Sequence, residues 1–402
     1  MTDITATPAP ALTSLQRATA FLDGILAGLY THSSGAPAPL SQPIISDPKI
    51  ARHILARTDY FVKNYAFLED VGCGRFSSNG DDWRQRAALT ESWYRRVHSK
   101  IQPSKVRDIY ARHLDTKSPL TANDLFHRFV LAAVEVFSCA LDLPVALPWP
   151  VELIDRLRAM LKLRQWVAWV GCSSEELQSI QHELAVLREQ VRRLWQEDPT
   201  AQAFINALQA KGVGLMGFDA AAELLQNLLA SSETTASTLL WAAEALSQQP
   251  TLQHQLAQDQ LVQDPHNLDR FIAEVLRMFP PVPCLTRLCT TTHSTDDGQI
   301  WQAGSVLTLS IVGIHRHPDY WQRPAEFDLT RPEYNPGVTP FAYMPFSRGE
   351  RVCAGMRLAK LELRIALEVL LERRICRPGP RPTGFKYGLS SVPDTSLSAD
   401  VR

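Results

Sequence analysis

The sequence predicts a mainly α-helical protein with a smaller amount of β-structure in short strands. Apolar residues recur at helical spacing through most of the chain, and proline or glycine marks the breaks between these stretches. Runs that are typical of strands are few and short. The 402 residues are 45% hydrophobic and 21% charged, an ordinary globular composition. This length allows either one large domain or roughly two or three smaller ones.

The expected elements follow one another as helices separated by proline-rich connectors. The first is an amphipathic helix between Leu12 and Tyr30, with Leu15, Ala18, Leu22, Ile25, Leu26 and Leu29 on its apolar face. The helix expected at 218–248 contains no glycine or proline and is apolar on more than one side, which is typical of a helix in the middle of a large domain. The other helices are expected at 47–57, 81–97, 103–116, 121–140, 151–170, 174–197, 200–210, 251–258, 265–279 and 355–373, and the strands at 285–291, 299–301, 305–311 and 388–392.

Charge and cysteine usage exclude several classes of protein. Lys and Arg total 41 against 42 Asp and Glu, so the chain lacks the basic excess of a nucleic-acid-binding protein. The seven cysteines are scattered without a CxxC spacing, which signals neither a disulfide framework nor a zinc site. Residues 1–11 lack the basic start of a secretory signal, and no window is apolar enough to span a membrane. We therefore expect a soluble, cytoplasmic protein.

The most informative string places a cysteine in a glycine-containing turn directly before a helix. It reads Phe346-Ser-Arg-Gly349-Glu-Arg351-Val-Cys353-Ala-Gly355 and closes a long, proline-punctuated segment that begins at residue 316. Long segments of this kind inside compact domains are usually functional. The turn N–H groups, the helix dipole and the nearby arginines are all expected to favour the Cys353 thiolate over the thiol.

This string closely resembles the haem-ligand loop of the cytochrome P450 family of haem-thiolate monooxygenases. The resemblance extends from about Ser41 to Leu389. It implies a single cytochrome P450 domain over 1–402, with an N-terminal segment at 1–41 and a β-rich lobe from about 42–65, 285–312 and 376–402. It also implies that haem b lies between the long central helix and this loop, with Cys353 as the axial ligand of the iron. Phe346 would shield the sulfur, and Gly349 and Gly355 would let the backbone approach the haem closely.

Two further motifs agree with the resemblance. Glu274 and Arg277 lie three residues apart on a predicted helix, and together with Arg331 they resemble the family's Glu-Arg-Arg network, which implies a structural role in fixing the Cys353 loop. On the long helix, the run from Leu229 to Thr235 resembles the oxygen-activation motif. Its Thr234 is expected to bond the carbonyl of Ala230 and open a groove, and Glu233 and Thr234 would relay protons. Ser231 stands where the family usually has glycine.

Cationic and aromatic side chains at family positions imply sites for the haem propionates. Arg287, Arg351 and Trp83 match these positions. The family commonly has arginine four residues after this tryptophan, whereas this chain has Ala87. Either Arg84 or Arg86 is a candidate replacement.

By position, a largely apolar set of residues is expected to line the substrate pocket, which suggests a hydrophobic small molecule. This set consists of Tyr65, Phe67, Leu68, Gln226, Leu229, Ala230, Pro283, Cys284, Leu285, Leu389 and Ser390. The resemblance implies a monomeric monooxygenase of the soluble bacterial type that serves secondary metabolism or catabolism. Electrons would come from NAD(P)H through ferredoxin reductase and ferredoxin, which would dock on a basic face carrying Arg348, Arg357, Lys360, Arg364, Arg95 and Arg96. Two alternatives stay open: a peroxide-driven peroxygenase and a non-catalytic ligand-binding or recruiting module.

Overall fold

Helices make up most of the computed structural model, which describes residues 9–32, 42–95, 101–262, 265–294, 298–334, 341–380 and 384–402. The first half of the chain forms α1 (Ala9–His32), α2 (Pro48–Ala56), the short 3-10 helix η1 (Ala66–Val71), α3 (Gly80–Arg95), α5 (Pro103–Leu114), α6 (Ala122–Ala140), α7 (Val151–Val170), α8 (Ser174–Glu197) and α9 (Pro199–Lys211). The second half forms α10 (Ala220–Gln248), α11 (Pro250–Val262), α12 (Pro265–Met278), α13 (Ile311–Ile314), η2 (Pro332–Tyr334) and α14 (Met356–Arg373).

The predicted helices are confirmed, and several of them start at residues whose side chains cap the first turn. Thr121 and Asp124 form a reciprocal capping box at the start of α6, and Ser173 and Glu176 do the same for α8. Asp219 accepts from the first backbone N–H groups of α10. The prediction at 251–258 was too short, because α11 continues to Val262. None of the described helices has the length and apolar character that a bilayer crossing requires.

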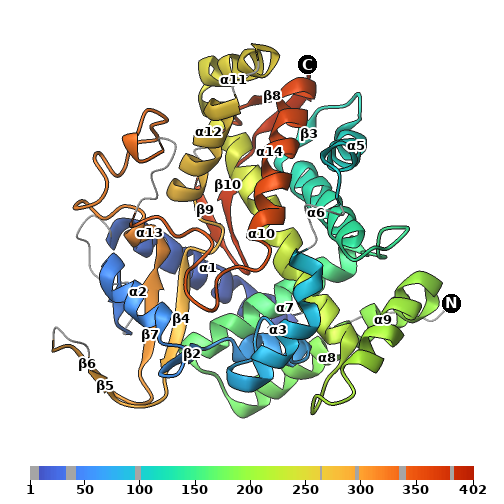
Figure 1. Ribbon diagram of the computed structural model, residues 1–402, viewed down its shortest axis with the longest axis vertical. Helices are drawn as coiled ribbons and strands as arrows, with labels where there is room; N and C mark the ends of the chain where they lie inside the picture. The colour runs from blue at the N-terminus through green and yellow to red at the C-terminus, as the bar shows by residue number, and fades with distance from the viewer. Residues whose placement is uncertain are drawn as a thin grey trace.

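Helix α10 is the central element of the molecule, as predicted. It is buried on nearly all sides and packs against α6, α14, α12, α9 and the strand β10 (Ser391–Asp394). Figure 1 shows α10 passing through the middle of the fold with α6 on one side and α12 on the other. At 29 residues it extends for about 44 Å, long enough to reach from the periphery to the functional site.

The strands divide among separate small sheets. The four-stranded sheet has the order β1-β7-β4-β2, built from Ile44–Ile45, Val306–Ser310, Cys284–Cys289 and Phe61–Lys63. The other sheets are β9 (Gly384–Tyr387) with β10, then β3 (Leu120–Thr121) with β11 (Ser398–Val401) and β8 (Arg374–Arg377), and finally β5 (His293–Ser294) with β6 (Ile300–Trp301).

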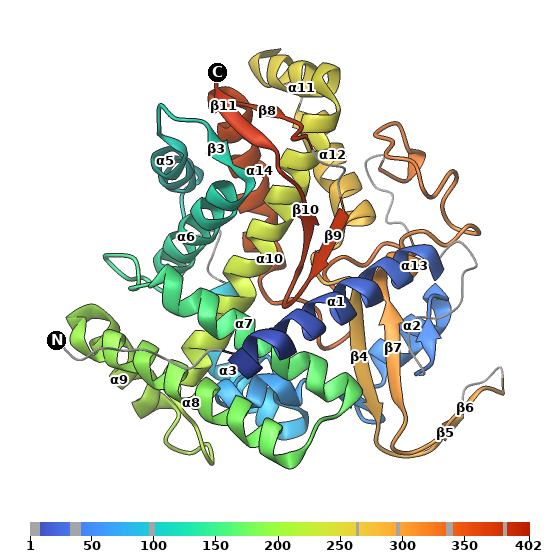
Figure 2. The ribbon, with the colours of Figure 1, turned by 180° about the vertical axis from the view of Figure 1, so that it is seen from behind.

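Two predictions about the β-structure need correction. Residues 42–65 and 285–312 share the four-stranded sheet, but residues from 376 onward join other sheets, so the predicted lobe is not one unit. The strand expected at 388–392 begins too early, because Gly388 and Ser390 form the bend between β9 and β10. Figure 2 shows α1 lying across this face of the molecule, where it contacts β9, α7 and α13. The apolar face of α1 is buried there, as expected for Leu22, Leu26 and Leu29.

Candidate functional site

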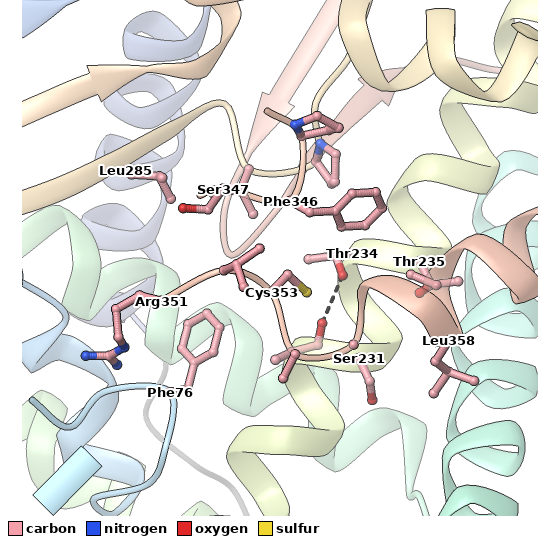
Figure 3. Close-up of a pocket in the computed structure, with 18 of the residues that line it drawn as sticks. Phe76, Ser231, Thr234, Thr235, Leu285, Phe346, Ser347, Arg351, Cys353 and Leu358 are labelled. Carbon is pink, nitrogen blue, oxygen red and sulfur yellow. Dashed lines mark hydrogen bonds between the residues drawn. The ribbon is translucent and has the colours of Figure 1, made fainter. Parts of the chain in front are cut away.

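A deep pocket lies between α10, the segment before α14, and the strands β2 and β4. It encloses about 1430 Å³ of empty space, part of it open to solvent. Cys353 and Gly355 contribute to its floor, and Ala230 and Thr234 of α10 contribute to another wall. Figure 3 shows the Cys353 sulfur directed into this space on the side where Thr234 lies. The structure therefore brings together the two motifs that stand 119 positions apart in the sequence.

A chain of backbone hydrogen bonds positions Cys353. Its N–H donates to the Phe346 carbonyl over 2.9 Å, and the Val352 N–H donates to the Gly349 carbonyl over 3.1 Å. The turn N–H groups and the nearby cations favour the Cys353 thiolate, as expected, but burial opposes them. Desolvation raises the pKa of Cys353, and the Gly355 N–H and the Lys63 ammonium lower it only in part. A coordinated metal ion would supply the missing stabilisation, since it deprotonates a thiol ligand outright.

The two glycines of the loop have different roles. Gly355 lines the pocket, and a Cβ atom there would stand 3.9 Å from the Cys353 sulfur. Gly349 does not line the pocket, so the expected close approach to a haem is not seen there. Its φ of +75° is the left-handed region that favours glycine, and a Cβ atom would meet the Leu55 carbonyl at 2.4 Å. Gly349 therefore allows the loop to pack on the end of α2.

The predicted hydrogen bond inside α10 is present. The Thr234 hydroxyl donates to the Ala230 carbonyl over 2.9 Å, and both residues line the pocket. Ser231 also faces the pocket and donates to the Leu228 carbonyl over 3.1 Å. The polar turn of α10 therefore satisfies its own hydroxyl groups, while Ser231 and Thr234 both line the cavity.

The Glu233 side chain points away from the pocket, and its predicted part in proton transfer stays a prediction. Its carboxylate forms a buried ion pair with the guanidinium of Arg158 on α7, at 2.7 Å between Oε1 and Nε, and it does not line the pocket. The side chains at 233 and 234 leave the helix about 100° apart, and here Thr234 faces the cavity whereas Glu233 faces Arg158 of α7. Burial raises the pKa of Glu233, and the charge of Arg158 partly opposes this rise.

Arg287, Arg351 and Trp83 lie together at the pocket, as predicted. The Arg351 guanidinium stacks 4.3 Å from the centre of the Trp83 ring and donates to the Ser78 carbonyl over 2.9 Å. Burial and the neighbouring Arg287 lower the pKa of Arg351 to about 10. Neither arginine has a carboxylate within ion-pair distance in the part of the chain that is described. This uncompensated positive charge fits a cofactor that carries carboxylates.

Neither candidate for the missing arginine of α3 reaches the pocket. Arg84 is exposed and pairs with Asp81 at 2.6 Å and with Glu350 at 3.5 Å. Arg86 is buried on the other side of the helix, where it pairs with Asp82 and Glu223.

Several predicted pocket residues serve packing instead. Gln226 points away from the cavity, because its amide donates to the Leu68 carbonyl over 3.1 Å and also to the Gly72 carbonyl. Cys284 is buried against the Tyr387 hydroxyl. Of the predicted set, Tyr65, Ala230 and Leu285 line the pocket, whereas Phe67, Leu68, Gln226, Leu229, Pro283, Cys284, Leu389 and Ser390 do not.

Sequence reasoning missed other residues of the pocket wall. The largest omissions are Lys63, Arg75, Tyr94, Asn227 and Glu362. Glu362 is buried, its pKa is raised well above the usual value by desolvation, and Tyr110 donates to it over 3.2 Å. The helical spacing after Cys353 is the one signal that could have found Glu362. The positions of Lys63 and Arg75 depend on loop geometry that no local pattern reveals.

The residues of the predicted Glu-Arg-Arg network meet in the interior. The carboxylate of Glu274 accepts from Arg277 at 2.8 Å through both oxygens and from Arg331 Nε at 3.1 Å. It also accepts from the Asp328 N–H at 2.8 Å and from the Tyr334 hydroxyl. Arg277 in turn donates to the His315 carbonyl, and the Met344 N–H donates to the His315 ring. The network thus connects α12 to the segment that leads to the Cys353 loop.

Comparison with known proteins agrees with this arrangement. Residues 172–374, half of the chain, match the family model for cytochrome P450. A fold of this kind around a cysteine loop and a central helix defines a haem-thiolate protein. The chain belongs to the cytochrome P450 family.

Individual relatives are distant. The chain is similar to cytochrome P450 4A24 of Sus scrofa, with 34% identity over 43% of this chain and 37% of that protein. It is similar to cytochrome P450 4A14 of Rattus norvegicus, with 27% identity over 84% of this chain and 76% of that protein. Its fold resembles the crystal structure of CYP175A1 from Thermus thermophilus, with a TM-score of 0.73, 21% identity and coverage of 99% and 98%. The family is confirmed, while the soluble bacterial type stays a prediction.

Proposed function

We propose that this chain is a haem-thiolate monooxygenase that inserts one oxygen atom of O2 into a largely hydrophobic small organic molecule. The proposal rests on the position of the Cys353 sulfur, which points into the pocket. The wall of this pocket contains the Thr234 turn of α10 and several cationic side chains. A haem group requires these three elements for its iron, for its oxygen-binding face and for its propionates.

The residues of this chain would divide the work as follows. Cys353 would hold the haem iron through its thiolate, and Arg287, Arg351 and Trp83 would hold the propionates. When bound, the haem supplies dioxygen binding and cleavage of the O–O bond, which thiolate ligation favours. The Thr234 hydroxyl lies at the cavity and can hold a water molecule there. Glu233 would exchange protons with that water after its carboxylate leaves Arg158.

The character of the pocket supports a hydrophobic substrate. Outside the cationic region, its wall carries apolar side chains, among them Phe76, Val282, Leu285, Ile311 and Leu358. Such a wall favours ligands with little charge. The same machinery serves hydroxylation, epoxidation, desaturation and oxidative coupling. For electron supply we propose a separate acidic carrier of the ferredoxin type.

The ferrous–carbonyl absorption spectrum tests the role of Cys353. We expect the purified protein to show the red-shifted Soret band that thiolate ligation produces, and Cys353→His to lose that shift while a haem remains bound. Cys172→Ser, on the α7–α8 connection, serves as the matched control and should leave the spectrum unchanged. A Cys353→His variant with the thiolate band intact would overturn the proposal. If a Cys353→Ala variant kept full biological activity, a non-catalytic ligand-binding module would be favoured over a monooxygenase.

One observation favours a second function, a peroxide-driven peroxygenase. Peroxide already carries the protons and electrons of reduced oxygen, so a peroxygenase does not need a mobile acid. In this structure Arg158 holds Glu233 outside the pocket, which agrees with such an enzyme. Thr234→Ala separates the two functions. In a carrier-driven monooxygenase it should lower product formed per NAD(P)H consumed by about tenfold or more. An unchanged ratio, together with faster turnover on hydrogen peroxide, would favour the peroxygenase.

A further inference from the structure

The pocket carries more positive charge than the sequence motifs account for. Four cationic side chains line it, and two of them, Lys63 and Arg75, belong to no recognised motif. Lys63 ends β2 and is paired in register with Arg287 of β4, so that two cations stand directly opposite each other. Like charges in such a cross-strand pair are destabilising unless an anion lies between them.

Lys63 has no carboxylate partner among the described residues. Its ammonium donates to the Phe76 carbonyl over 3.1 Å and lies over the Phe76 ring. Burial, followed by the charges of Arg351 and Arg287, lowers its pKa well below the usual value. The backbone of Lys63 is fixed at the same time, because Asn79 bonds both its N–H and its carbonyl. The Lys63 ammonium therefore lies among the other cations of the pocket with a carbonyl acceptor and no carboxylate partner.

Arg75 lies against the turn of α3 from which the family's usual arginine is absent. Its Nη1 donates to the carbonyl of Ala87 itself at 3.4 Å and to the Thr90 hydroxyl at 3.1 Å. Its Nη2 pairs with Glu91 at 3.3 Å, and the guanidinium lies 5.1 Å from the centre of the Tyr94 ring. The methyl group of Ala87 is small enough to leave this position to a guanidinium that comes from outside the helix.

The backbone of Arg75 is anchored from the opposite wall. Its N–H donates to both carboxylate oxygens of the buried Glu223 on α10, at 2.9 and 3.0 Å. The Arg75 carbonyl accepts from Arg351 at 3.4 Å. Arg75 is therefore held between α3, α10 and the propionate-binding Arg351, in a fixed and partly buried position.

We propose that Arg75 takes the place of the absent α3 arginine and, together with Lys63, binds the carboxylates of the haem propionates. The inference rests on the haem-binding role proposed above. The positive charge that the family usually places on α3 therefore comes, in this chain, from the segment before α3. This also explains why Arg84 and Arg86 are free to form ion pairs elsewhere.

Haem transfer from the holoenzyme to excess apomyoglobin tests the proposal. Arg75→Ala should lose haem about tenfold faster or more, because a charge-assisted hydrogen bond is removed. Lys63→Met should act in the same direction. Arg84→Ala, the alternative suggested by the sequence, should transfer haem at the unaltered rate. Ala87→Arg added to Arg75→Ala should restore retention, since it returns the charge to the usual family position.

A second cofactor distinguishes propionate binding from a merely structural role. The apoprotein is reconstituted with haem dimethyl ester, whose propionates carry no charge, and its transfer rate is measured in the same way. We expect equal rates for the unaltered chain and Arg75→Ala with the ester. Faster loss of the ester from Arg75→Ala, or unchanged retention of ordinary haem, would overturn the inference. If the unaltered chain takes up no haem, the proposed function itself fails, which is a different outcome.

Discussion

The buried ion pair between Glu233 and Arg158 is the residue-scale feature with the widest consequences. It joins the acid of the oxygen-activation motif on α10 to the helix α7 across the interior. The Glu233 side chain is almost completely buried, whereas Arg158 remains 21% exposed. Water can therefore reach the pair from the Arg158 side, and we expect the acid to exchange protons along that route.

Replacement of Arg158 should make stability depend more strongly on pH. Burial already raises the pKa of Glu233 above 4.5, and Arg158 is the largest influence that lowers it. A carboxyl group whose pKa is higher in the folded than in the unfolded protein contributes its full stabilisation of the fold below the unfolded-state pKa. This contribution is lost as pH rises through the folded-state pKa. Arg158→Met raises that pKa further. Compared with the unaltered chain, Arg158→Met should therefore lose about a further 1–3 kcal/mol of unfolding free energy as pH rises from about 4.5 to neutral.

Denaturant unfolding at a series of pH values measures this effect. Arg156→Met is the matched control on the same helix, because Arg156 forms an exposed pair with Glu183. Its effect should be within about 0.5 kcal/mol and independent of pH. If the unfolding free energies of Arg158→Met and the unaltered chain change in parallel with pH, the ion pair between Arg158 and Glu233 has no influence on the ionisation of Glu233.

At the scale of elements, Glu274 connects α12 to the long segment before the cysteine loop. One buried carboxylate satisfies two guanidinium groups, a backbone N–H and a tyrosine hydroxyl. The segment around Asp328 and Arg331 has little regular structure of its own, so these bonds determine its path. Arg277 pairing lowers the pKa of Glu274 despite its burial.

Glu274→Gln should destabilise the protein by about 3–5 kcal/mol, since it leaves buried guanidinium groups without their counter-charge. The depressed pKa predicts the opposite pH dependence from Glu233. The contribution of Glu274 is present above its unfolded pKa and is lost as pH falls through its folded pKa. The variant should therefore approach the unaltered chain in acid. Thermal and denaturant unfolding, followed across that range, provide the measurement.

Glu326→Gln is the control for the network. Glu326 also pairs with an arginine, Arg323, but both side chains are more than half exposed. We expect a loss below about 1 kcal/mol. A comparable loss in both variants would mean that Glu274 contributes no more than an ordinary surface charge.

At the scale of the whole molecule, a net charge of −1 is compatible with a local basic face. Of the residues predicted for it, Arg357 and Lys360 are exposed on α14, and Arg348 lies at the loop partly buried. Arg364 is engaged in ion pairs with Asp269 and Glu368. The side chain of Arg95 and the residue Arg96 lie outside the described part. Arg357 and Lys360 are thus the best candidates for contact with an acidic electron carrier.

Reduction by such a carrier should be sensitive to salt. Arg357→Glu with Lys360→Glu should slow reduction about tenfold at low ionic strength, because it removes electrostatic steering. The difference should shrink as salt shortens the Debye length. Stopped-flow reduction measures both effects, and Lys211→Glu, at the exposed end of α9, is the control. A rate that does not respond to salt in any of these proteins would exclude this face as the docking surface.

Local patterns predicted most of the fold because helix formation and capping depend on neighbouring residues. The long helix α10, the amphipathic α1 and the turn before α14 were all recognisable in this way. The resemblance placed residues 42–65 in the β-rich lobe, but the individual strands β1 and β2 within it, and β3 outside it, were not predicted, since two or three residues hold no periodicity and their partners lie far away in the sequence.

The sequence by itself determined the family, the cysteine loop and the Thr234–Ala230 hydrogen bond, because each depends on residues close together in the chain. Only the tertiary structure decided which charged side chains face the pocket. In the folded protein Glu233 pairs with Arg158, and Arg86 pairs with Glu223. Arg75 lies beside Ala87. The physical reason is that a buried charge adopts the orientation in which it finds a partner, and these partners come from distant segments that only folding brings together.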